Sequence, residues 1–113
     1  MSDQRQQRFT QLLESFSARI GGLLEETGRH RSEDLPVELL DELAGTMGEL
    51  LIVLTDYQSF HGEDHLTRRV ISDAQLLRES IRSRLLQSEQ LVAAVGALAD
   101  EVYQIIREDK RAA

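Results

Sequence analysis

The second half of this chain carries one helical pattern that is too long for the rest of the chain to cover. Across residues 66–106, apolar side chains recur at spacings of three and four, with no proline and no pair of glycines. Such spacing places side chains on one face of an α-helix. The pattern predicts a single helix over about residues 64–109. Its stripe consists of Val70, Ala74, Leu77, Ile81, Leu85, Ser88, Val92, Val95, Leu98, Val102 and Ile105.

Two shorter helices are predicted before it, over about residues 3–27 and 35–59. The first has its stripe at Phe9, Leu13, Phe16, Ile20 and Leu23, and the second at Leu39, Leu43, Met47, Leu50 and Leu54. Gly21 and Gly22 lie inside the first helix, where together they cost about 2 kcal/mol relative to alanine. We expect this pair to mark either a close approach of another helix or a local bend. Gly28 and Gly62 indicate the two turns.

Helix length decides the predicted architecture. At 1.5 Å per residue, the first two helices extend about 35 to 40 Å each and the third about 70 Å. The part of the third helix that extends beyond the first two is called the overhang. Leaving about five of its large apolar side chains in water would lose about 7 to 15 kcal/mol of stabilisation from burial. The predicted fold is therefore an all-α, three-helix antiparallel bundle in one domain, residues 1–113, whose over-long C-terminal helix is completed by dimerisation. Two alternatives stay open: a bend at residues 87–90 folds the end back, or a different protein covers it.

The predicted dimer interface combines the overhang with part of the second helix. Residues 50–54 are all apolar, and a helix that is apolar all the way round is covered all the way round. Coiled-coil pairing of two copies, parallel or antiparallel, would cover both regions. The predicted interface residues are Leu50, Leu51, Val53, Leu54, Leu91, Val92, Val95, Leu98, Val102, Ile105 and Ile106.

Composition and charge narrow the classes of function. A net charge of -7 disfavours nucleic acids and anionic membranes, because both attract clustered Lys and Arg. The absence of cysteine excludes disulfides and thiolate metal sites. Residues 1–8 are polar and carry no apolar core of the kind that a signal peptide needs, and the longest apolar run, residues 91–99, is too short to span a membrane. We therefore expect a cytoplasmic protein without a cofactor, and its preference for Arg over Lys indicates a GC-rich genome.

No group of side chains predicts catalysis. His61 and His65 have a spacing that can bind a divalent metal on one helix, but Gly62 between them indicates a turn. The second helix carries carboxylates that we expect to be solvated, at Glu38, Asp41, Glu42 and Glu49. The third carries a basic region that we expect to pair with them, at Arg68, Arg69, Arg78, Arg82 and Arg84. No serine has a companion histidine in helical register, so no catalytic or metal-binding residue is predicted.

In its small size, acidity, lack of cysteine and amphipathic C-terminal helix, the chain resembles the helical export chaperones of bacterial flagellar and type III secretion systems. The resemblance concerns architecture and assigns no residues. We predict a non-enzymatic helical protein-protein interaction module, such as an adaptor, small chaperone or regulatory subunit, acting through the apolar stripe of its C-terminal helix. The alternative is a metal-dependent hydrolase similar to the helical nucleotide pyrophosphohydrolases. That function would need the carboxylates of the second helix to converge with others around magnesium.

Overall fold

The protein is a bundle of four helices. The structure is a computed structural model, and it describes residues 2–31, 34–62 and 64–112. The helices are α1 (Ser2–Gly28), α2 (Val37–His61), α3 (His65–Arg82) and α4 (Ser88–Ala112), and no strand occurs in the described ranges. The all-α prediction is confirmed, but the prediction of three helices is wrong: the expected long helix over residues 64–109 is two helices, α3 and α4.

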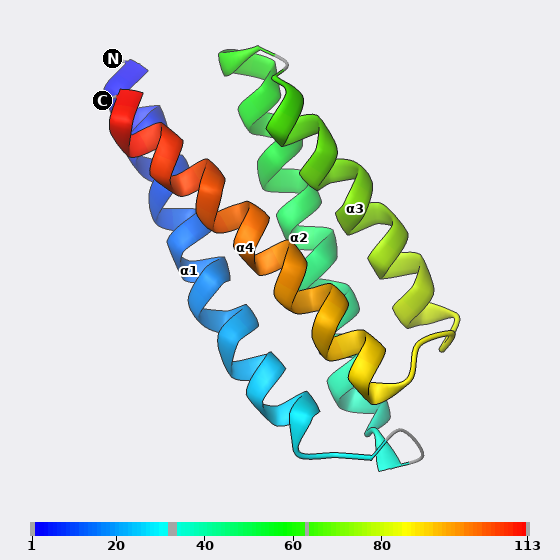
Figure 1. Ribbon diagram of the computed structural model, residues 1–113. Coiled ribbons are helices and arrows are strands. Elements are labelled where there is room, and N and C mark those ends of the chain that lie inside the picture. The colour runs from blue at the N-terminus through cyan, green and yellow to red at the C-terminus, as the bar shows by residue number, and fades with distance from the viewer. Residues whose placement is uncertain (1, 32–33, 63, 113) are drawn as a thin grey trace.

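The four helices run alternately up and down, and the two chain ends lie at the same end of the bundle (Figure 1). The packing is uneven around the bundle. α1 packs most extensively on α4, and α2 on α3, whereas the contacts of α1 with α2 and of α3 with α4 are less extensive. The bundle measures 49 × 21 × 19 Å, so no helix extends beyond the others for half its length.

The chain reverses direction over residues 83–87. Arg84 adopts a left-handed conformation with a φ of 53°. The amide N–H of Leu85 donates to the Ser80 carbonyl, and that of Arg84 donates to the Ile81 carbonyl. This pair of bonds is the Schellman motif that ends many helices. A polar side chain begins the next helix, because the Gln90 side-chain oxygen accepts from the Gln87 N–H at 3.0 Å, as in half of a capping box.

The apolar pattern of the sequence does not reveal this reversal. Ile81 and Ser88 are both buried, one before and one after the turn, and they lie seven residues apart in the sequence. Seven residues are about two turns of helix, so the stripe continues in phase although the helix does not. Leu85 occupies a stripe position but is 72% exposed in the turn. A pattern of spacings alone therefore could not distinguish a hairpin from one long helix.

The predicted dimer interface lies mostly in the core of the bundle. Leu51, Val53 and Val92 are half-buried. The other eight predicted interface residues are buried: Leu50, Leu54, Leu91, Val95, Leu98, Val102, Ile105 and Ile106. The predicted overhang does not exist, because α4 folds back along α1, and this outcome matches the folded-back alternative. Within residues 50–54, Ile52 is 72% exposed, so α2 has a solvent face after all.

Hydrogen bonds and ring contacts fix the two ends of the core. At one end, the Ser88 hydroxyl donates to the carbonyl oxygens of His30, at 3.0 Å, and Thr27, at 3.3 Å. These bonds hold the start of α4 against the end of α1. At the other end, the rings of Phe9 and Tyr57 stack with centroids 3.8 Å apart, which joins α1 to α2.

The beginnings of α2 and α3 differ in how they are capped. Asp64 caps α3, since its carboxylate accepts from the Thr67 N–H at 2.8 Å. α2 begins at Val37, after Pro36, and has no side-chain cap bond.

The left-handed residue in the reversal generates the first prediction. A left-handed conformation costs a residue with a Cβ about 1 to 2 kcal/mol, so Arg84→Gly should raise the free energy of unfolding by about 1 kcal/mol. Urea unfolding followed by circular dichroism measures this. Arg82→Gly is the matched control, because it removes the same charge from a helical position and should lower stability by about 1 kcal/mol. Equal effects of the two variants would contradict the assignment of the turn.

The glycine pair of α1 generates the second prediction. Gly21 and Gly22 are exposed, and a Cβ added at either position would meet no atom within 4 Å. The expected close approach of another helix is therefore wrong, and α1 continues through the pair. Gly21→Ala and Gly22→Ala should each stabilise the protein by about 1 kcal/mol. Gly62→Ala is the control and should destabilise it, because Gly62 has a φ of 92°; the thermal midpoints of the three variants test this order.

Candidate protein-binding groove

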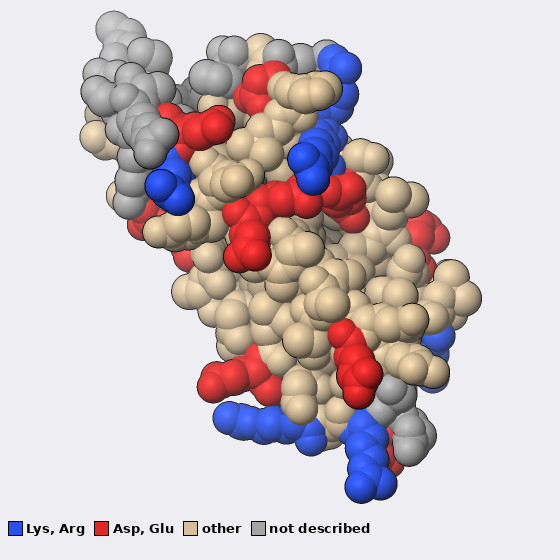
Figure 2. Space-filling model, in the orientation of Figure 1, with Lys and Arg blue, Asp and Glu red and all other residues tan. Residues whose placement is uncertain are grey.

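An open groove with a volume of about 290 Å³ runs between α3 and α4. Its walls are formed by Leu76, Leu77 and Ser80 of α3 and by Ala94, Ala97 and Leu98 of α4. Leu86, from the turn, also lines the groove, as do Asp73 and Glu101 one helical turn beyond Leu76 and Ala97. Figure 2 shows this face of the bundle, where an uncharged surface crosses the middle and acidic side chains gather along its upper border.

The apolar character of the groove comes in part from residues outside the main stripes. Leu76 is 67% exposed, although it lies beside the buried Leu77. On the opposite wall, Ala94 and Ala97 have short side chains that do not reach across to α3. Because α3 contacts α4 less extensively than it contacts α2, the space between these walls stays unfilled. The result is an apolar surface that is both concave and open to solvent.

One end of the groove holds the neighbouring carboxyl groups of Asp73 and Glu101, whose mutual repulsion is only partly opposed by a nearby basic residue. The Glu101 Oε2 atom is buried, and no hydrogen-bond donor among the described residues reaches it. Burial raises the pKa of the Glu101 carboxyl above its ordinary value of 4.5, and Asp73 raises it further, by hydrogen bonding and by charge repulsion. The charge of Arg69 partly opposes these effects on the pKa. Two carboxylates are acceptors only, so Asp73 and Glu101 can share a hydrogen bond only when one of them holds a proton.

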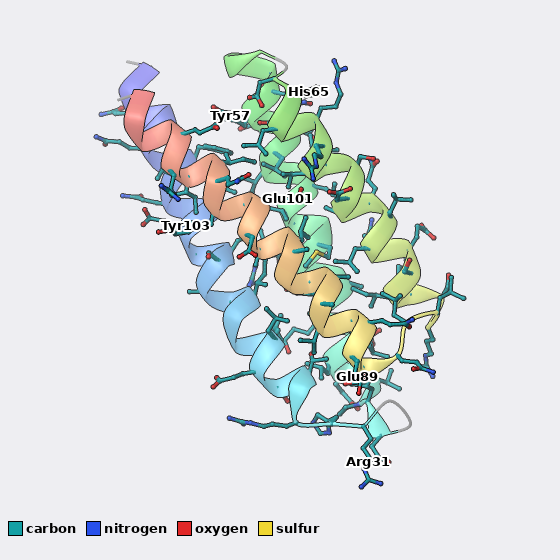
Figure 3. All side chains as sticks on the ribbon, in the orientation of Figure 1. Arg31, Tyr57, His65, Glu89, Glu101 and Tyr103 are labelled. Atoms are coloured by element: carbon teal, nitrogen blue, oxygen red, sulfur yellow. The ribbon has the colours of Figure 1, made fainter. Side chains whose placement is uncertain are left out.

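Two elements far apart in the sequence create this acidic end. Asp73 lies in α3 and Glu101 lies in α4, and both line the groove between the two helices; Figure 3 labels Glu101 on α4. Only the reversal at residues 83–87 brings them together. Sequence analysis missed the pair because a continuous helix would separate these two residues by about 40 Å. No spacing signal in the sequence marks them.

The candidate metal ligands do not converge. His61 ends α2 and His65 begins α3, so the two histidines do not share a helix face; the side chain of His61 is outside the described residues. Of the carboxylates on α2, Glu49 is paired with Arg19 of α1, while Glu38, Asp41 and Glu42 are exposed. Among the residues whose side chains the structure describes, no three His, Asp or Glu come together as metal ligands would.

The basic region of α3 is not one surface. Arg68, Arg69, Arg82 and Arg84 are exposed, whereas Arg78 is half-buried. The Arg78 guanidinium lies over Gly48 of α2, about 3.6 Å from where a Cβ would be. Its buried Nε has no acceptor within the described part of the chain. Arg78 therefore contacts α2 at Gly48 through its guanidinium group, and not at one of the carboxylates with which we expected the basic region to pair.

Comparisons with known protein families, curated proteins and solved structures found no match to this chain. The surface must therefore be interpreted from its own chemistry. None of the described helices combines the length and the apolar character that crossing a bilayer requires. The cytoplasmic location and the absence of nucleic-acid partners and cofactors stay predictions.

The raised pKa of Glu101 generates the third prediction. A folded-state pKa above the unfolded value means that the folded protein holds this proton more tightly. Protonation of Glu101 therefore raises the free energy of unfolding as the pH falls from 7 through the raised pKa. This increase is complete below about pH 4.5, the ordinary pKa of the group. Glu101→Gln should remove that part of the pH dependence. It should also raise stability at pH 7 by about 1 kcal/mol, because a glutamine amide can donate to Asp73.

Urea unfolding of the wild type and of Glu101→Gln at a series of pH values tests this, since their difference cancels the other titrating groups. Glu108→Gln is the control, because it removes the same charge from an exposed position of the same helix. Parallel stability curves for the wild type and Glu101→Gln would show that the carboxyl pair does not affect folding.

Proposed function

We propose that this protein is a non-enzymatic helical interaction module that binds a protein partner in the groove between α3 and α4. The observation that carries the proposal is the groove itself, a concave apolar surface with Leu76 two-thirds exposed on its wall. Open apolar concavities are where proteins bind partner side chains. Burying Leu76 against a partner would contribute about 2 kcal/mol, or about 30-fold in affinity.

The energetics of the core argue against the binding surface expected from the sequence. The stripe of α4 would become available only if α4 detached from the bundle. Detachment would expose six apolar side chains that are now buried, at about 1.5 to 3 kcal/mol each. The stripe consists of Leu91, Val95, Leu98, Val102, Ile105 and Ile106. The total of about 9 to 18 kcal/mol is comparable with the stability of a whole domain, so we assign binding to the outer face of α3 and α4.

The homodimer stays a prediction, but the surface that a second copy would bury is a different one. Because α4 folds back and leaves no overhang to cover, a second copy would have to cover the groove. An adaptor, a small chaperone and a regulatory subunit all use such a surface in the same way, and so does an export chaperone of the kind that the chain resembles. The proposal concerns the shared property, which is recognition of another polypeptide by a rigid helical face.

Site-specific photo-crosslinking tests this function and generates the fourth prediction. A benzoylphenylalanine placed at Ala97, which is exposed on the groove wall, should crosslink a partner polypeptide in cells of the native host. The same probe at Ile52, which is 72% exposed on α2, should not. Leu76→Asp should reduce the crosslink at position 97 at least about tenfold, because it leaves a charge in an apolar contact.

The mass of the product separates the possible occupants. A product of about twice the chain mass of 12.8 kDa identifies a second copy, and any other mass identifies a different protein. Crosslinking that is absent at position 97, or equal at positions 97 and 52, would exclude the groove as a binding surface. Circular dichroism of Leu76→Asp confirms that the variant is folded, as expected for a side chain that is already largely exposed.

A further inference from the structure

We propose that the groove takes one amphipathic helix of another protein, and that this helix places a Lys or Arg side chain against Asp73 and Glu101. The inference rests on the proposed function and names the chemistry of the partner. Two features carry it: the size and shape of the apolar part of the groove, and the negative charge at one end, which Arg69 compensates only in part.

The apolar part of the groove fits a short helix. Leu76 to Ser80 form one wall and Ala94 to Leu98 form the other, and with the carboxyl pair each wall extends over about two turns, or about 10 Å. The small alanine side chains permit the interaxial distances of about 8 to 10 Å at which helices pack. A helix lying there would contact the walls with apolar side chains at positions i and i+4, as in other helix-in-groove complexes.

The acidic end selects the charge of the partner. The buried Glu101 Oε2 atom lacks a donor among the described residues, and the neighbouring Asp73 offers only acceptors. A Lys or Arg one helical turn beyond the apolar pair would lie against this carboxyl pair, which lines the open groove, and would compensate the repulsion between the two groups. The net charge of -7 also favours a basic partner at long range.

The same electrostatics disfavour a second copy as the occupant. Two copies that each carry a charge of -7 repel one another. Among the described side chains, the most exposed apolar one elsewhere on a helix is Ile52, and it is flanked on α2 by Glu49 and Asp56, one turn to either side. A copy that inserted this face would bring carboxylates to the acidic end of the groove.

A display selection tests the chemistry of the partner and generates the fifth prediction. The immobilised full chain is used to select helical peptides of about 14 residues from a library randomised along one face, with counter-selection on Leu76→Asp. The enriched peptides should carry apolar residues at i and i+4 and a Lys or Arg about one turn further on. Fluorescence polarisation of one labelled peptide then measures affinity for the wild type and the variants.

Glu101→Gln should weaken binding of that peptide at least tenfold, although the same variant stabilises the free protein. Replacing the peptide's Lys or Arg with Gln should weaken binding to the wild type by a similar factor and should have little effect on binding to Glu101→Gln. Ile52→Asp is the matched control and should bind as the wild type does. A purely structural role of Glu101 would not produce this coupling between one peptide position and one protein position.

The possible results distinguish failure of this inference from failure of the proposed function. Peptides that depend on Leu76 but show no preference for Lys or Arg would overturn this inference and leave the proposed function standing. A library that yields no Leu76-dependent peptide, together with no crosslink at position 97, would overturn both. Light scattering that gives a stable dimer, dissociated by Leu76→Asp but not by Ile52→Asp, would identify a second copy as the occupant and overturn the inference.

Discussion

The reversal between α3 and α4 is the constraint on which the rest of the structure depends. It places α4 along α1, so that the apolar stripe of α4 completes the core. The turn requires Arg84 to be left-handed, at a φ of 53°, which costs about 1 to 2 kcal/mol. The stripe that it buries contributes several times more, so the bundle tolerates a residue that is poorly suited to the turn. The Ser88 hydroxyl, bonded to carbonyls at the end of α1, fixes where α4 begins.

The same reversal explains what the sequence could and could not predict. The first two helices were predicted well, because their stripes are separated by turn signals such as Pro36 and Gly62. The third was predicted too long because Ile81 and Ser88 are in phase across the turn, and because position 84 holds Arg in place of the glycine that usually marks a Schellman motif. The groove could not be predicted at all, since its two walls face each other only after the chain reverses.

An apolar stripe on a helix can be covered in more than one way. The free energy of burying the residues of α4 is the same whether the cover is another part of the chain or another molecule. The sequence therefore establishes that the stripe is covered, and only the turn decides by what. The run at residues 50–54 gives a related lesson, because Ile52 is 72% exposed and folded proteins commonly leave single apolar side chains in water. A short all-apolar run is not by itself a sign of a second chain.

The carboxyl pair at the end of the groove is unfavourable for the free protein and favourable for the binding that we propose. At the Asp64 cap and at the Arg19 to Glu49 ion pair, local and global preferences agree. At Glu101 they conflict, since a buried carboxylate oxygen without a donor lies beside a second carboxylate. Such conflicts are expected at sites shaped by binding. A cation brought by a partner would remove the conflict, so binding would stabilise the folded protein both by mass action and by relieving the repulsion. Among the described residues, the charge of Arg69 opposes the effect of this repulsion on Glu101 only in part, so a cation on another molecule would compensate it further.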